Sequence, residues 1–118
     1  MSAYSIALVT VPDKKLAEKL SASLIKGKLA ACVNIVPDIS SVYRDKGGIE
    51  KSSESLLIIK TRSALIADLS EFVRQNHPYS TPEVIAVSIQ DGLQKYLDWI
   101  GANTLFTKAT LNNPSEEA

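Results

Sequence analysis

The chain has 118 residues, long enough for one domain with its own hydrophobic core. Its 13 basic and 13 acidic residues cancel, so no strongly charged surface for nucleic acid or an anionic membrane is predicted. The single cysteine, Cys32, excludes an internal disulfide and a paired-cysteine metal site. No apolar run is long enough to cross a bilayer, and no signal-peptide pattern precedes Tyr4. We therefore expect a cytoplasmic protein, although a targeting segment removed from a precursor would leave the same pattern.

The chain begins with a predicted strand and helix. The apolar run from Ile6 to Val11 predicts a buried strand that ends at Pro12. Asp13 is a good N-cap residue, because its carboxylate can accept hydrogen bonds from free N–H groups in the first helical turn. Gly27 is expected to end this helix. Apolar residues recur between them at helical spacing: Leu16, Ala17, Leu20 and Leu24.

A long hairpin is expected next. The run 29–36 predicts a second strand, Pro37-Asp38 indicates a bend, and residues 40–44 resume extended structure. Lys46-Gly47-Gly48 is the strongest turn signal in the chain and is expected to form the hairpin tip. Residues 49–61 then return as a long strand that becomes apolar toward its end.

The second half predicts a helix, a strand and a short helix. Ser63 is expected to cap the helix, which must end near Asn76 because the next residue precedes a proline. Val84 to Ile89 predicts the fourth strand, and a short helix is expected to end near Gly101. The apolar stripe of the longer helix consists of Leu65, Leu69, Phe72 and Val73.

The predicted order is β-α-β-β-α-β with an extra C-terminal helix. This order favours an α+β, ferredoxin-like sandwich spanning residues 1–102, and we expect 103–118 to be a polar, flexible tail. Two helices can cover only one face of a four-stranded sheet, yet three of the strands are apolar on both faces. A second copy of the chain is the simplest cover for the other face, so an oligomer is expected.

The segment from Asn76 to Glu83 is the strongest candidate site. It holds the only histidine, His77, and its two prolines stiffen the loop. Imidazole, carboxylate and thiolate all suit copper or zinc, so His77, Glu83 and Cys32 are candidate metal ligands. The alternative is that His77 caps the preceding helix and bonds locally, and that Cys32 is a small packing residue.

Several segments in order along the chain resemble the CutA family. The resemblance covers residues 6–100 and implies a ferredoxin-like fold, a tight homotrimer similar in shape to PII-type signalling proteins, and a role in divalent-cation tolerance. The matching segments are Thr10-Val11-Pro12-Asp13, 29–35, Ser41-Val42-Tyr43, Ile49-Glu50, Ile59-Lys60-Thr61, His77-Pro78-Tyr79 with Pro82-Glu83, and Tyr96-Leu97-Asp98-Trp99.

The chain also departs from the family pattern. Some bacterial CutA proteins carry a cysteine and a second histidine at the positions of Val9 and Asn76. Family members usually carry a tryptophan where this chain has Asp45, close to the hairpin tip. The departures remove two plausible metal ligands and change the side chain with which the hairpin would contact a neighbour.

Three functions follow as expectations. The first is copper tolerance or homeostasis, with weak Cu²⁺ binding near His77 and no required cofactor. The second is small-molecule signalling through an inter-subunit cleft lined by Asn34, Lys60 and Tyr79, together with Glu83, by analogy with PII-type trimers. The third is a structural role in anchoring or maturing a protein partner, contacted through the C-terminal tail. No nucleophile elbow or phosphate-binding loop is present, so we do not expect an enzyme.

Overall fold

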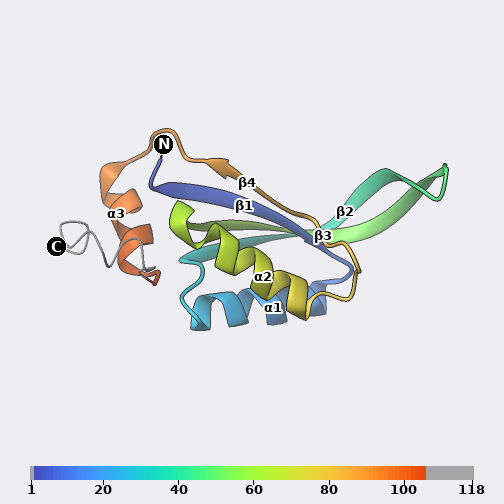
Figure 1. Cartoon of the computed structure of the whole chain (residues 1–118), viewed down its shortest axis with the longest axis horizontal. Coiled ribbons are helices and arrows are strands. Elements are labelled where there is room, and N and C mark those ends of the chain that lie inside the picture. The colour runs from blue at the N-terminus through green and yellow to red at the C-terminus, as the bar shows by residue number, and fades with distance from the viewer. Residues whose placement is uncertain (1, 106–118) are drawn as a thin grey trace.

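The computed structural model describes residues 2–105, in which two helices cover one face of a four-stranded antiparallel sheet (Figure 1). A third helix lies at one end, and a hairpin projects from the other end. The strands are β1 (Tyr4–Val11), β2 (Cys32–Asp45), β3 (Gly48–Arg62) and β4 (Val84–Ser88). The helices are α1 (Lys14–Lys26), the 3₁₀ turn η1 (Ser63–Leu65), α2 (Ile66–Asn76) and α3 (Gln94–Ala102). No helix among the described residues is long and apolar enough to cross a membrane.

The sheet has the order β2-β3-β1-β4, which confirms the predicted ferredoxin-like α+β fold. β1 lies at the centre, where Ala7 aligns with Ile59 of β3 and Ala86 of β4. Asp13 caps α1 as predicted, since its carboxylate accepts a hydrogen bond from the Leu16 N–H at 2.8 Å.

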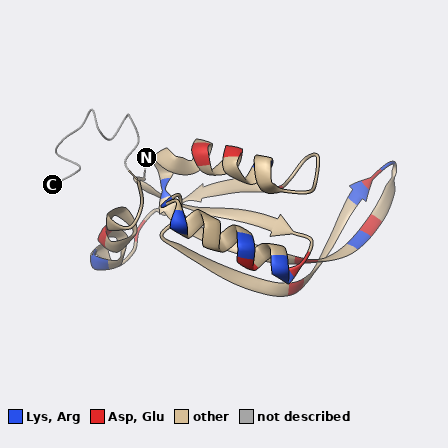
Figure 2. Cartoon of the chain, turned by 90° about the horizontal axis from the view of Figure 1, so that it is seen from below, with Lys and Arg blue, Asp and Glu red and all other residues tan. Residues whose placement is uncertain are grey.

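The main core lies between the sheet and the two helices. One face of β1 and β3 meets the apolar stripes of α1 and α2, as helical spacing and strand alternation require. Its fully buried side chains include Val9, Val11, Leu24, Leu57, Ile59, Leu69 and Val73. Basic and acidic positions are distributed over both helices and the hairpin, so neither sign of charge dominates the molecule (Figure 2).

The opposite face of the sheet carries a second set of apolar side chains and no helix. Ile85 and Val87 of β4 are 54% and 53% exposed on this face. Ile85 aligns with Leu8 of β1, which pairs with Ile58 of β3. Val87 aligns with Ile6 of β1, which pairs with Lys60 of β3. We call the set Ile6, Leu8, Leu56, Ile58, Ile85 and Val87 the helix-free face.

The second strand differs from its predicted form. It begins at Cys32, not Leu29, because Lys28 adopts a positive φ of 57° that turns the chain before the strand starts. The predicted bend does not divide it into two strands. Instead, β2 runs through Pro37 as one strand. Asp38, with φ of 57°, is accommodated by a shift in the pairing register with β3 between Val36 and Ile39.

Ser63 does not cap α2, contrary to the prediction. It begins the 3₁₀ turn, and α2 starts at Ile66 with no side-chain cap. The Ser63 hydroxyl instead donates to the Ser2 carbonyl at 2.9 Å and lies 2.6 Å from the Ser5 hydroxyl. The side chain thereby fastens the start of β1, a contact that local sequence spacing does not reveal.

Arg62 attaches α3 to the sheet. Its buried guanidinium donates to the Gly101 carbonyl at 2.7 Å and to the Thr104 hydroxyl at 3.0 Å. A cation at a helix C-terminus is favourable because the last carbonyls carry partial negative charge. The Leu105 N–H also donates to the Lys28 carbonyl, so bonded structure extends past residue 102. The rest of the predicted tail, 106–118, lies outside the described residues.

Candidate functional site

His77 follows the last residue of α2, and backbone groups engage both of its ring nitrogens. Nδ1 accepts a hydrogen bond from the Tyr79 N–H at 3.1 Å. The proton must therefore be on Nε2, which lies 2.7 Å from the Thr10 carbonyl and donates to it. The side chain is only 9% exposed. His77 is the C-cap residue of α2 and bonds locally to the Tyr79 N–H, as the sequence alternative expected. Its bond to the Thr10 carbonyl of β1 was not predicted.

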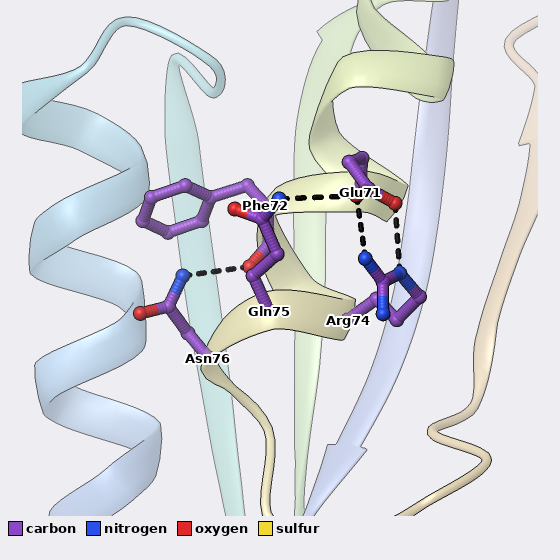
Figure 3. A network of polar contacts seen from close by, with 5 residues as sticks. All are labelled: Glu71, Phe72, Arg74, Gln75 and Asn76. Carbon is purple, nitrogen blue, oxygen red and sulfur yellow. Dashed lines mark hydrogen bonds and ion pairs between the residues drawn. The ribbon is translucent and has the colours of Figure 1, made fainter.

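The end of α2 is stabilised by polar contacts that do not involve His77. Arg74 makes two hydrogen bonds with Glu71, at 2.8 and 2.6 Å, and Gln75 donates to the same carboxylate (Figure 3). Asn76 donates to the Phe72 carbonyl at 2.8 Å. Asn76, the last residue of α2, therefore adds a side-chain hydrogen bond to the final helical turn.

Tyr79 links this loop to β3. Its ring packs against the His77 ring with centroids 4.6 Å apart, and its hydroxyl donates to the Glu54 carboxylate at 3.0 Å. Burial and the adjacent Glu54 carboxylate raise the pKa of Tyr79 to about 12. His77 and Tyr79 together hold the 77–83 loop against both β1 and β3.

A groove of about 800 Å³ lies between this loop and the base of the hairpin. Glu83 lines it with Tyr79, and Tyr43 and Arg44 line it from β2. Glu54 lies in its wall and is only 7% exposed. The sequence analysis assigned no role in a site to Glu54, and it named Tyr43 only as part of a family segment. Their signal was weak, because both lie in hairpin strands that looked solvent-exposed.

Cys32, Asn34 and Lys60 form a separate cluster at the other end of the sheet. The Lys60 ammonium contacts the Asn34 amide oxygen and lies 4.0 Å from the Cys32 sulfur. Burial of the Tyr96 hydroxyl, together with the adjacent Cys32 sulfur, raises the pKa of Tyr96. The Tyr96 ring stacks on Trp99 at 5.5 Å, with both rings partly exposed.

The predicted site residues fall into these two regions. His77 bonds to Thr10, whereas Cys32 aligns through Lys60 with Ile6, four residues back along β1. At about 3.3 Å per residue, Cys32 lies roughly 13 Å farther along the sheet. Among residues 2–105, no group of three or more histidine, cysteine, aspartate or glutamate side chains is placed to hold a metal ion. A ligand set of His77, Glu83 and Cys32 is thus not assembled within one copy of the chain.

The predicted inter-subunit cleft is divided in the same way. Asn34 and Lys60 lie together, but Tyr79 bonds to Glu54, six residues before Lys60 on β3. A single copy of the chain therefore does not bring the three together, and only residues from different copies could complete that cleft.

Residues 5–103 match the model of one protein family, described as CutA1 divalent ion tolerance protein. The chain is 50% identical over 99 residues to Protein CutA, chloroplastic, of Arabidopsis thaliana, covering 84% of this chain and 54% of that protein. It is 41% identical over 99 residues to the divalent-cation tolerance protein CutA of Thermus thermophilus, covering 84% and 96% respectively. The chain thus spans about half the length of the plant relative.

The solved structures agree with these sequence relations. The crystal structure of CutA1 from Oryza sativa superposes with a TM-score of 0.88 at 47% identity, covering 90% of this chain and 97% of that one. A CutA1 structure from Thermus thermophilus gives a TM-score of 0.85 at 40% identity, covering 86% and 99%. The fold, the match over residues 5–103 and the identities lead to one conclusion: this chain belongs to the CutA1 divalent ion tolerance protein family.

Proposed function

We propose that this protein acts in divalent metal-ion tolerance or homeostasis and binds Cu²⁺ at the His77 loop. Family membership supports the general role, because the family and the relative from Thermus thermophilus are named for divalent-cation tolerance. The observation that carries the site is the geometry of His77. Its Nδ1 lone pair is held by one backbone N–H at 3.1 Å, which a copper ion could replace.

Glu83 is the second proposed ligand, since it lines the groove that Tyr79 also lines. Cys32 could contribute only from a neighbouring copy, because it lies roughly 13 Å along the sheet within one subunit. Few ligands within a subunit imply weak binding, and no cofactor is proposed to be required for folding.

Copper titration tests this proposal. The change is His77→Ala, with Asn76→Ala as the matched control on the neighbouring residue. We expect His77→Ala to weaken copper binding by about tenfold or more, because an imidazole ligand is lost, while Asn76→Ala leaves it unchanged. Isothermal titration of folded variants measures the affinities. Equal affinities of wild type and His77→Ala would disprove the site.

We further propose that the protein assembles as a homotrimer. The support is the helix-free face, whose exposed Ile85 and Val87 continue an apolar surface across β1 and β3. Monomeric proteins seldom leave so continuous an apolar surface in water. The projecting hairpin offers a second contact, because its exposed edge can pair with a neighbour's strand.

A second candidate function is small-molecule signalling, which the groove beside the hairpin favours. Its volume of about 800 Å³ is in the range of small-ligand sites. In a trimer, Asn34 and Lys60 of one copy and Tyr79 of another could line one cleft. A thermal-shift screen with nucleotides and metabolites tests this idea, and a flat response would count against it.

We propose a binding protein, not an enzyme, since both nitrogens of the only histidine are bonded to backbone groups. The cytoplasm stays the proposed location, although two plant relatives are named as chloroplastic and one solved CutA as periplasmic. A partner protein contacted through the C-terminal tail, residues 103–118, stays a prediction, because residues 106–118 lie outside the described part of the chain.

A further inference from the structure

The outer side of α1 carries a stripe of exposed lysines. Lys15, Lys19 and Lys26 are separated by four and seven positions, a spacing that places them on one side of a helix. Figure 2 shows basic positions along the length of α1. Within residues 2–105, none of these three lysines forms an ion pair with a carboxylate. The stripe therefore offers positive charge to an acidic segment from outside this part of the chain.

A small, mainly apolar pocket lies beside this stripe, between α1 and α2. Lys19 lines it together with Leu16, Leu20 and Phe72, and its volume is about 60 Å³. Sites for small molecules usually exceed about 300 Å³, so this pocket suits a single apolar side chain instead. The two helices cover the face of the sheet opposite the helix-free face. Assembly through the helix-free face would thus leave the pocket and the lysines accessible.

The chain leaves the described residues beside the end of α1. The Leu105 N–H donates to the carbonyl of Lys28, two positions after the last residue of this helix, at 2.9 Å. Residues 106–118 follow and are called the C-terminal segment. Its sequence places an apolar residue, Leu111, in the middle and two acidic residues, Glu116-Glu117, near the end. One apolar and one acidic part are what the pocket and the lysine stripe require.

The length of the C-terminal segment matches the distances along α1. The residues of α1 that line the pocket lie 5 to 12 positions before Lys28, roughly 8 to 18 Å away at the helical rise per residue. Leu111 is six positions after Leu105 and can reach up to about 20 Å. Glu117 is six positions farther on, so it can pass the pocket and reach Lys15 near the start of the helix.

We propose that the C-terminal segment docks on α1 of its own copy, with Leu111 in the pocket and Glu116 and Glu117 beside Lys15 and Lys19. The same copy is the partner because the segment leaves the body next to this helix. The acidic end then lies near the start of α1, where the helix N-terminus adds partial positive charge. The docked segment covers the outer side of α1 and so excludes other acidic protein segments from it. This contact does not depend on metal binding.

Limited trypsin digestion of the full chain tests this contact, because Lys108 is a trypsin site within the C-terminal segment. Docking shields the site, so wild type should be cut there about tenfold or more slowly than a synthetic peptide of residues 104–118. Mass spectrometry measures the product that ends at Lys108. Leu111→Ser should speed this cleavage by about fivefold or more, relative to a peptide with the same substitution, because the apolar contact is lost.

A charge exchange tests the acidic end separately. Replacing Lys15 and Lys19 by glutamate should speed cleavage by about threefold or more, since attraction becomes repulsion. Adding Glu116→Lys and Glu117→Lys to that variant restores the opposite charges and should restore the slow cleavage. Both changes leave the pocket residue Leu16 and the trypsin site intact.

Lys51→Glu combined with Lys95→Glu is the matched control, because these exposed lysines lie on β3 and α3 and give the same change in net charge. It should leave the cleavage rate unchanged. Cleavage of wild type as fast as the peptide would overturn the proposal. An unchanged rate in Leu111→Ser would overturn the contact in the pocket. Failure of the charge exchange to restore slow cleavage would overturn the pairing of the acidic end with the lysine stripe.

Discussion

In the sequence, His77 indicates a metal site. In the fold, the same residue has a structural role. Its two ring nitrogens connect the end of β1 to the 77–83 loop through the Thr10 carbonyl and the Tyr79 N–H. A metal ion must compete with one of these hydrogen bonds. Copper binding is therefore expected to be weak and to loosen the contact between Tyr79 and its neighbours.

At the residue scale, Tyr79→Phe should alter the behaviour of the protein at high pH. The pKa of Tyr79 is raised to about 12 by burial and by Glu54, above the unfolded value of about 10. A raised pKa means that the folded state holds the proton more tightly, so this stabilisation is full below pH of about 10 and is lost as pH rises toward 12.

Absorbance titration of the phenolates measures this effect. Wild type should show a component at the highest pH that Tyr79→Phe lacks. At neutral pH the variant should also lose about 1 kcal/mol of unfolding free energy, because Glu54 loses its hydrogen-bond donor. Retention of the high-pH component in Tyr79→Phe would show that another tyrosine is the perturbed one.

At the scale of elements, the hairpin depends on a two-residue turn. Lys46 and Gly47 have φ of 49° and 80°, and Asp45 pairs with Gly48 across the turn. Two positive φ values are typical of a type I′ turn, whose twist matches that of the strands. The sequence predicted this tip, since glycine adopts positive φ at little steric cost.

Gly47→Ala should destabilise the protein by about 1 kcal/mol, because an alanine is strained at positive φ even where its Cβ meets no neighbour. Gly48→Ala is the matched control. Its φ lies outside the positive region, and an added Cβ would lie 3.8 Å from the nearest atom, the Asp45 carbonyl oxygen. Chemical denaturation measures both variants, and equal losses would contradict the assigned turn geometry.

The attachment of α3 provides a second test at this scale. An added Cβ at Gly101 would lie 2.8 Å from the Tyr4 hydroxyl and 3.2 Å from the Arg62 guanidinium. Alanine favours a helix by about 1 kcal/mol over glycine, but this contact requires Tyr4 to move. We expect Gly101→Ala to lower the unfolding free energy by about 1 kcal/mol.

A double-mutant cycle with Tyr4→Phe identifies the cause. Removing the hydroxyl should relieve the contact, so Gly101→Ala should be neutral or stabilising in the Tyr4→Phe background. An undiminished loss in that background would place the strain at Arg62 instead.

At the scale of the whole molecule, the helix-free face should control assembly. Ile85→Glu places a charge on this face, and we expect the mass of the particle to fall toward that of one chain. Ile25→Glu is the matched control, since Ile25 is an exposed isoleucine on α1, outside that face. Sedimentation equilibrium measures both masses. A monomeric wild type would contradict the proposed trimer, and an unchanged mass in Ile85→Glu would contradict the role of the helix-free face in its assembly.

The sequence predicted the fold well, because the signals that define it are local. Alternating and helical apolar patterns identified the strands and helices, and Asp13, Gly27 and Gly47 identified the ends of elements. The resemblance to the CutA family was also visible in the sequence, because its motifs are continuous segments. The match over residues 5–103 confirms that identification.

Tertiary structure alone decided which of these residues meet. Glu54 and Tyr79 are 25 positions apart, and the Ser63 hydroxyl reaches Ser2 across 61 positions. Such contacts depend on strand register and on the crossing of α2 over the sheet, which no local pattern encodes. The sequence thus determined the elements and the family, whereas packing separated His77 from Cys32 and placed Glu54 in the wall of a groove.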